Sequence, residues 1–450
     1  MALRMWLIAA SLLVCILPGN ADYEPFTAEE FTDRLQRAQQ KMKEQGLGAL
    51  LLTMEVHHFY FTGVKSEFWQ SPTRPYYLVI PRIGGMIAVV PSISGSLYEE
   101  NVELIDAVHT WPAPVPEDDG ISLLEEALRQ ALKKSDAGNV IGTELGWEFQ
   151  LRMPVSDFNR LSKLMEEGGA SFTDATLLLK RLRAVKSDAE IALMRKNCQA
   201  QSAVMSSIPV HAGMTEKEAA RTARTELTKA GADRVPYVAC RSGMGGYEDI
   251  VGSASNRVLE DGDVLIIDTG SVLDGYFCDF NRNWHIGELT ESPMTEELTK
   301  IQAALYRAVD AGIREARPGR TTADIFHAMA AELPATGSSV GRMGHGVGLA
   351  ITEWPSILPG EAGQNVTLEA GMVLAIEPSA GFGSGNQFLV HEEDVVVSEG
   401  GGVILSVRGP RVLPTLPGKF AAGKKVLGDT SLFTPVCSGQ NITSSCNITS

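Results

Sequence analysis

The chain has 450 residues, 44% of them hydrophobic, and carries a formal net charge of −16 at pH 7. Because a single hydrophobic core seldom grows beyond about 250–300 residues, this length predicts two domains. The negative charge repels nucleic acid and anionic membrane surfaces, which excludes both as expected partners.

The N-terminus has the features of a secretory signal peptide. Arg4 precedes an apolar run from Met5 to Leu17, and the small residues Gly19 and Ala21 follow. The run is short for a membrane span, so we expect cleavage after Ala21 and a secreted or extracytoplasmic chain, with an uncleaved anchor as the alternative. No later stretch is long enough to span a bilayer, so no membrane span is expected in the mature chain.

Residues 22–175 alternate helical and strand patterns. Thr27, with Glu30 three residues later, has the pattern of a capping box and predicts a helix to about Gln45. Strand patterns follow at 48–53, 76–80 and 86–90, and a helical pattern covers 121–134. This alternation predicts an α/β layer structure. His57 and His58 fall on an expected loop, either at the surface or within reach of a neighbouring active site in a dimer.

A charged helical passage beginning at Lys180 opens the second part of the chain, and we place the domain boundary just before it, at 175/176. Two further helices are expected at 215–230 and 295–316, with strands between and after them. The second domain is therefore predicted over 176–416. Residues 417–450 are polar and poor in large apolar side chains, which predicts a flexible tail.

The cysteines and the glycosylation sequons are few. Cys198, Cys240 and Cys278 lie in mixed or apolar surroundings and are expected to be free and buried. Cys437 and Cys446 flank a polar stretch and could close a small disulfide loop in an oxidising compartment. Sequons that a glycosylating host would modify begin at Asn365, Asn441 and Asn447.

The segment VLIIDTGSVLDGYFCDFNRN contains two strand-like runs joined at Asp274-Gly275, a strong turn signal. Asp268 and Asp279 lie at equal distances from a turn centred near Leu273 and Asp274, so antiparallel pairing predicts that they face each other. Like charges directly opposed on paired strands are destabilising, and a cation between them would remove the repulsion.

A second pair of carboxylates has the same arrangement. Glu377 and Glu393 flank a glycine-rich connection centred near Gly385, and His345 lies between glycines in GHGVG. Each residue alone has an ordinary structural explanation, but two matched carboxylate hairpins with one histidine indicate a metal site. Five such ligands without a thiolate suit Mn, Fe, Co or Zn and allow two ions bridged by carboxylates and a water.

These residues resemble the metallopeptidases of the pita-bread fold, which include methionine aminopeptidase, aminopeptidase P, prolidase and the related hydrolase creatinase. The blocks that carry the resemblance are IIDTG, DGYFCDFNRN, GHGVG, GMVLAIEP and HEED, and KRLRAVKSDAEIALMRK resembles the segment that opens the catalytic domain. The resemblance covers about 28–415. It implies an α/β N-terminal creatinase-like domain followed by an α+β pita-bread catalytic domain, and a homodimer.

The resemblance also implies roles for the five ligands. Asp268 would bind one metal ion, Asp279 and Glu393 would bridge two, and His345 and Glu377 would complete the set. Glu377 would also take the proton from a bridging water. The implied cofactors are two divalent ions, Mn first and Zn, Co or Fe as alternatives.

The chain departs from the family pattern in the auxiliary residues. Three histidines usual in the peptidases are missing, at positions that align near Val251, Gly341 and Thr352, and His391 replaces an arginine two residues before the last ligand. Because those groups move protons and hold the reaction intermediate, their loss puts the cleavage of proline peptides in doubt without affecting the metal ligands.

Other residues can substitute for the missing groups. On a regular strand His391 would point to the same side as Glu393, which makes it a candidate catalytic residue, although a supporting or surface role is the alternative. Arg342 and Glu353 lie close to His345 in sequence and are candidates for binding a charged substrate, or are simply solvated charges.

The function predicted from the sequence is a secreted hydrolase with two metal ions. It resembles Xaa-Pro aminopeptidases and dipeptidases, and it would cleave a C–N bond in a small peptide through a metal-bridging water. One alternative keeps the fold but changes the reaction to that of a creatinase-like hydrolase or a lyase acting on a small metabolite. The other is a binding protein without catalysis.

Overall fold

The computed structural model describes residues 26–419, apart from short gaps at 72–73, 100–102, 136–137, 335–340, 361–364 and 382–385. The predicted signal peptide, the candidate disulfide between Cys437 and Cys446, two sequons and most of the predicted tail lie outside these residues. The chain divides into two compact units, Met1–Leu182 and Arg183–Ser450. Among the described residues, none of the helices is both long and apolar enough for a transmembrane segment.

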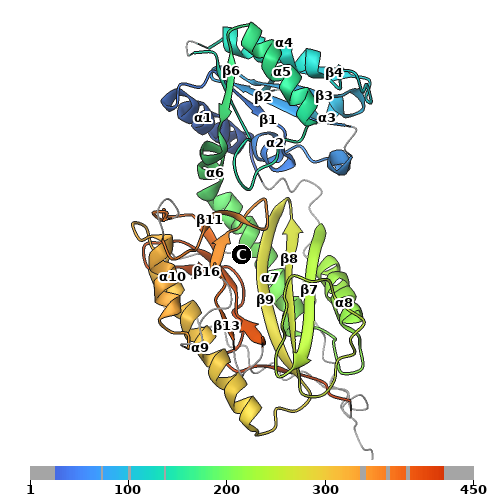
Figure 1. Ribbon diagram of the computed structural model, residues 1–450, viewed down its shortest axis with the longest axis vertical. Helices are drawn as coiled ribbons and strands as arrows, with labels where there is room; N and C mark the ends of the chain where they lie inside the picture. The colour runs from blue at the N-terminus through green and yellow to red at the C-terminus, as the bar shows by residue number, and fades with distance from the viewer. Residues whose placement is uncertain are drawn as a thin grey trace, which may run out of the picture. The chain divides into compact units, whose positions relative to one another are not determined.

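The first unit is built on a six-stranded mixed sheet with the strand order β4-β3-β2-β1-β5-β6 (Figure 1). Its strands are β1 (Ala49–Leu52), β2 (Tyr77–Pro81), β3 (Met86–Pro91), β4 (Ile105–Trp111), β5 (Val140–Thr143) and β6 (Ser171–Asp174). Its helices are α1 (Ala28–Glu44), α2 (Glu55–Thr62), α3 (Gly95–Glu99), α4 (Ile121–Lys133) and α5 (Val155–Glu167), with short 3-10 turns η1 (Glu67–Gln70) and η2 (Ser92–Ser94). Every residue of β1, β2 and β3 is buried, which explains their continuous apolar runs. This α/β unit was predicted from the alternation of patterns.

Helix α6 (Thr176–Ala184) carries the chain across the boundary between the units. The second unit contains a four-stranded sheet, β17-β9-β8-β7, and a five-stranded sheet, β11-β10-β12-β15-β16. Its strands are β7 (Arg234–Met244), β8 (Asp263–Leu273), β9 (Tyr276–Ile286), β10 (Gly344–Gly346), β11 (Glu353–Ser356), β12 (Val373–Ile376), β15 (Glu393–Val396), β16 (Val403–Ile404) and β17 (Thr415–Leu416), with a separate pair β13 (Ser379–Gly381) and β14 (Phe388–Val390). The mixture of helices and mainly antiparallel strands is the α+β architecture predicted for this part.

Four helices accompany these sheets, namely α7 (Asp188–Ser206), α8 (Glu216–Lys229), α9 (Pro293–Glu315) and α10 (Thr322–Ala330). Helix α7 contacts β8 and β9, and α8 contacts β7 (Figure 1). Helix α9 contacts β12. Each begins at a capping box, with Ser187, Thr215, Ser292 and Thr321 as the N-caps. The predicted helices at 215–230 and 295–316 are confirmed to within a few residues.

A disulfide bond joins Cys198 on α7 to Cys278 on β9. The expectation that both cysteines are free is therefore wrong, whereas Cys240 is free and buried as predicted. The two partners are 80 residues apart, and only the packing of α7 against β9 brings them together.

The paired histidines of the first unit are structural. His57 and His58 are fully buried on α2 rather than on a loop. His57 Nδ1 lies 2.5 Å from Glu144 Oε1, and His58 contacts the hydroxyl of Tyr98 and the carbonyl oxygen of Leu52. Neither side chain is exposed to meet a second molecule.

Removal of the Cys198–Cys278 disulfide is expected to destabilise the second unit. Because the bond closes a long loop of the unfolded chain, the double variant Cys198→Ala/Cys278→Ala should lose on the order of 2–4 kcal/mol of unfolding free energy. Denaturant unfolding without reductant measures the loss. The variant Cys240→Ala is the control, because it must keep the sensitivity to reductant that the double variant loses. Equal stability of wild type and double variant would contradict the assignment.

Candidate metal centre

The first carboxylate pair lies on the hairpin of β8 and β9. Asp274 and Gly275, both at positive φ, form the turn, and the strands pair so that Gly270 lies opposite Asp279 and Asp268 opposite Asn281. The two aspartates are thus diagonal neighbours on one face, two positions away from the direct opposition predicted. The offset arises because the turn is centred one residue later than expected.

A tyrosine that the sequence analysis missed links the two aspartates. The hydroxyl of Tyr237, on β7, donates to Asp268 Oδ1 at 3.1 Å and also to Asp279 Oδ1. Tyr237 pairs with Gly270 across the strands, and a Cβ atom on Gly270 would lie 2.8 Å from the tyrosine ring. Glycine at this position therefore leaves room for the ring that reaches the carboxylates.

The second carboxylate pair differs from the prediction by one residue. Strands β12 and β15 pair antiparallel with Ile376 opposite Glu393, so the next residues outward, Glu377 and Glu392, share the opposite face. Because side chains alternate along a strand, a shift of one residue exchanges the two faces. The structure accordingly groups Glu392, and not Glu393, with the other four predicted ligands.

Glu393 belongs to a separate buried network. Its carboxylate accepts hydrogen bonds from Arg282 Nη2 at 3.1 Å, from the backbone N–H of Gly409 at 2.9 Å and from the hydroxyl of Ser406. Burial opposes ionisation of this carboxylate, but Arg282, His391 and the hydrogen bonds together lower the pKa of Glu393 below its ordinary value. In the structure Glu393 is an ion-pair partner outside the two ligand groups, and its expected role as a bridging metal ligand remains a prediction.

His345 lies on β10, between β11 and β12. The carbonyl oxygen of Gly346 can only accept, so the contact of 2.8 Å from His345 Nδ1 assigns the proton to Nδ1 and leaves the Nε2 lone pair free. Nε2 lies 3.7 Å from Asp279 Oδ2. The flanking glycine is required because Gly344 has φ +141° and a Cβ atom there would lie 2.2 Å from the backbone oxygen of Ala375.

The five residues form two groups that share one carboxylate. Asp279, His345 and Glu392 offer ligand atoms within 4.8 Å of one another, and so do Asp268, Glu377 and Glu392. The first group offers oxygen and nitrogen donors and the second offers oxygen donors alone, and divalent ions such as Mn, Zn or Fe accept both kinds. Glu392 belongs to both groups, so its carboxylate lies within reach of ligand atoms in each of them.

The electrostatics of the cluster favour the binding of a cation. Burial raises the pKa of Asp268 to about 6, and burial together with the neighbouring Asp268 raises the pKa of Glu377 to about 7. For the same reasons the pKa values of Asp279 and Glu392 lie well above the ordinary range. Burial, with a smaller effect of the Arg342 charge, lowers the pKa of His345 to about 4, so the imidazole is neutral and available as a ligand. A cation would relieve the repulsion among the carboxylates.

A further aspartate, Asp394, holds the backbone of Asp279. Asp394, which the sequence analysis did not consider, accepts a hydrogen bond at 2.8 Å from the backbone N–H of Asp279 through Oδ2. Cys198 of the disulfide contacts the same oxygen at 3.4 Å. Asp394 points to the same side of β15 as Glu392, so the correct strand register would have identified both residues.

His391 and Arg342 are two further residues that the sequence predicts in the site. His391 lies beside Glu393, with its Nε2 atom 3.7 Å from Glu393 Oε1, and is not part of either ligand group. Its predicted catalytic role depended on Glu393 being a ligand, and that role remains a prediction. Arg342 acts on the pKa values of His345 and Glu377 through its charge, so its predicted role in substrate binding remains a prediction.

Glu353 is not an exposed substrate-binding group. It is buried, and its carboxylate pairs with Arg183 and with Lys186 Nζ at 3.3 Å. Although burial opposes ionisation, these two cations lower the pKa of Glu353 to about 2.

Asn365 is exposed, and its side-chain oxygen accepts from the backbone N–H of Ala323 near the start of α10. Glycosylation of Asn365 remains a prediction.

Both units match families of known proteins. Residues 34–185 match the model of the creatinase/prolidase N-terminal domain, and residues 192–399 match the model of metallopeptidase family M24. The probable dipeptidase PepE of Mycobacterium tuberculosis H37Rv is 29% identical over 386 residues, which cover 84% of this chain and 95% of that protein. The Xaa-Pro dipeptidase of Pyrococcus furiosus is 25% identical over 353 residues, covering 77% and 90%.

A solved structure shows the same similarity. The dipeptidase PepE of Mycobacterium ulcerans superimposes with a TM-score of 0.71 at 28% identity, over 87% of this chain and 99% of that structure. The predicted fold, a creatinase-like N-terminal domain followed by a pita-bread catalytic domain, is confirmed.

Replacing Glu392 and Glu393 one at a time tests directly which of the two adjacent glutamates is a metal ligand. Glu392→Gln should weaken Mn²⁺ binding by at least about 100-fold, because a shared ligand loses its charge. Glu393→Gln is the matched control, since it removes one charge from the neighbouring residue and should leave the number of bound ions unchanged. Calorimetric titration of metal-free protein with Mn²⁺ measures both. Loss of metal in the Glu393 variant alone would overturn the assignment.

The raised pKa values predict how the stability of the metal-free protein depends on pH. Asp268 and Glu377 titrate near 6 and 7 when folded but near 4 when unfolded, so the folded state binds more protons between about pH 4 and pH 7. The contribution of these two groups to stability is therefore lost as the pH rises through that window.

Thermal unfolding in EDTA should show this loss, and Glu377→Gln should reduce it. Added Mn²⁺ should raise the melting temperature more at pH 7.5 than at pH 5, where the ion must displace protons. Equal effects of Mn²⁺ at the two pH values would contradict the prediction.

Proposed function

The chain belongs to metallopeptidase family M24, and on that premise we propose that it is a peptidase with two divalent metal ions that hydrolyses a C–N bond in a dipeptide or other small peptide. The observation that carries the proposal is the pair of ligand groups that share Glu392. The similarity to PepE and to an Xaa-Pro dipeptidase supports a small peptide as the substrate.

The residues present fit two metal ions. Four buried or half-buried carboxylates and a neutral imidazole form the donor set, comprising Asp268, Asp279, His345, Glu377 and Glu392. Bound ions would lower the pKa of a water between them and polarise the carbonyl group that the water attacks. We propose Mn²⁺ first, with Zn, Co or Fe as alternatives, because oxygen ligands predominate.

Glu377 is the proposed proton acceptor. Glu377 and Asp268 are half-buried, whereas Asp279 and Glu392 are buried, and of the two half-buried residues Asp268 is held by the hydroxyl of Tyr237. Tyr237 holds Asp268 and Asp279 in place through its hydroxyl.

The missing histidines favour a peptidase that is not specialised for proline. The aligned positions carry Val251, Gly341 and Thr352, none of which can transfer a proton through an imidazole, and Val251 is 92% exposed. The same observation supports the second candidate, a creatinase-like hydrolase or a lyase of this fold that acts on a small metabolite.

We also propose that the chain is secreted or extracytoplasmic and forms a homodimer. The N-terminal pattern from Arg4 to Ala21 supports export, and the Cys198–Cys278 disulfide is consistent with an oxidising compartment. Glycosylation at the three sequons applies only if the host glycosylates exported proteins.

A panel of dipeptides tests the function. The protein loaded with Mn²⁺ should hydrolyse apolar dipeptides without proline faster than Xaa-Pro dipeptides, and Asp279→Ala should abolish the activity together with the bound metal. Release of free amino acids, measured by chromatography, is the readout. Cleavage confined to Xaa-Pro substrates would contradict the proposed preference, and the absence of any peptide cleavage would favour the second candidate.

A further inference from the structure

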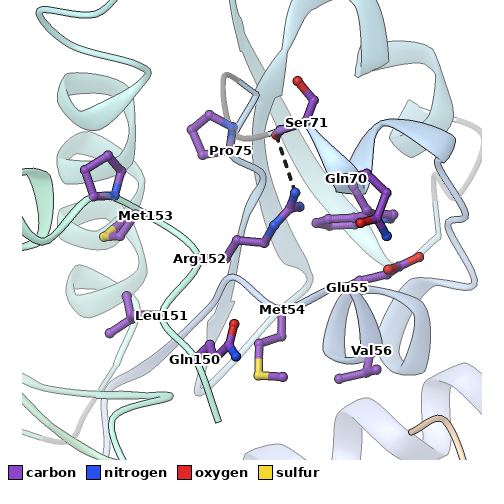
Figure 2. A pocket seen from close by; sticks show the side chains of 12 residues that line it. Met54, Glu55, Val56, Gln70, Ser71, Pro75, Gln150, Leu151, Arg152 and Met153 are labelled. Carbon is purple, nitrogen blue, oxygen red and sulfur yellow. Dashed lines mark hydrogen bonds between the residues drawn. The ribbon is translucent and has the colours of Figure 1, made fainter. Parts of the chain in front are cut away.

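The first unit contains a cavity of about 620 Å³ that is formed without any of the metal ligands. It lies between the start of α2, the 3-10 turn η1 and the segment 150–154. Met54, Val56 and Leu151 contribute apolar walls, and the side chain of Arg152 extends among the lining residues towards Ser71 (Figure 2). A cavity of this size accommodates a small molecule.

Arg152 offers the cavity a hydrogen-bond donor that has no acceptor. Its Nη2 atom donates to the carbonyl oxygen of Ser71 at 3.4 Å, as the dashed line in Figure 2 shows, but its Nη1 atom is buried without an acceptor in the described part of the chain. A buried guanidinium N–H without a partner is costly, because the group has lost its water.

Trp69 presents a second donor of the same kind. Its side chain is 2% exposed and is held by ring contacts with His58 and Tyr76 at 4.9 and 4.4 Å. The indole Nε1 atom is buried and, within the residues that the structure describes, has no acceptor. Both residues line the cavity, and the guanidinium carbon of Arg152 lies 5.5 Å from the centre of the indole ring.

The backbone around these donors is fixed in advance. The N–H of Arg152 donates to Thr53 Oγ1 at 2.8 Å, and the N–H and hydroxyl of Thr53 in turn donate to the buried carboxylate of Glu144 at 2.9 and 2.6 Å. A ligand would therefore meet donors that are already oriented, which reduces the entropy lost on binding.

From these contacts we infer that the cavity binds the carboxylate of a free amino acid or short peptide with an apolar side chain. Arg152 and Trp69 donate to the carboxylate, and Met54, Val56 and Leu151 contact the side chain. Glu55 also lines the cavity, so a group with one negative charge is favoured over a phosphate with two. This site is distinct from the metal centre and does not depend on the proposed peptidase activity.

Calorimetry with two small probes tests the proposal on the full chain in EDTA. N-acetylleucine has the carboxylate and the apolar side chain, whereas leucinamide has the side chain without the carboxylate. N-acetylleucine should bind at least tenfold more tightly than leucinamide. Asp279→Asn, which alters the metal centre, should leave that binding unchanged.

Substitutions locate the site. Arg152→Met should weaken binding of N-acetylleucine at least tenfold, and Trp69→Phe, which keeps an aromatic ring but removes the N–H, should weaken it severalfold. The matched control is Arg160→Met, since Arg160 is in the same unit but pairs with Asp118 at the surface, and this variant should bind normally.

Several outcomes would overturn the proposal. These are equal binding of the two probes, no binding of N-acetylleucine by wild type, or unchanged binding in Trp69→Phe. If Arg152→Met fails to fold by circular dichroism, Trp69→Phe and the comparison of probes still decide. Because every titration is done without metal, the result is independent of whether the chain cleaves peptides.

Discussion

The catalytic unit depends on one electrostatic constraint, the placement of four carboxylates and a neutral histidine in one buried or half-buried cluster. Without a cation, burial raises the pKa values of all four carboxylates, and the neighbouring carboxylates raise those of Asp279, Glu377 and Glu392 further, which means that the fold holds them in an unfavourable state. Strand pairing, the hydroxyl of Tyr237 and the closely packed glycine at 344 hold them there. A bound metal ion is the simplest explanation of this arrangement, because its positive charge would offset the repulsion among the carboxylates.

Strand register decides which carboxylates take part. The adjacent residues Glu392 and Glu393 have different contacts because they lie on opposite faces of β15. One joins the ligand groups and the other pairs with Arg282. The two neighbouring charges are kept apart, so the ion-pair network stabilises the strand without competing for a metal ion.

Much of this was predictable from the sequence, and the errors have physical causes. The turn at Asp274-Gly275 and the glycines around His345 are strong local signals, so the first hairpin and the histidine were identified. The register of β15 could not be read in the same way, because Val395, Val396 and Val397 are all apolar and give no alternation to mark the buried face. The disulfide and the buried ion pairs of Glu353 depend on contacts between distant segments, which no local pattern reveals.

The shared role of Glu392 is tested most directly by a crystal structure of the protein grown with Mn²⁺ and measured for anomalous scattering. Two anomalous peaks are expected in the second unit, both in contact with the carboxylate of Glu392, while Glu393 remains paired with Arg282. A single peak, or ions coordinated by Glu393 with Glu392 turned away, would contradict it.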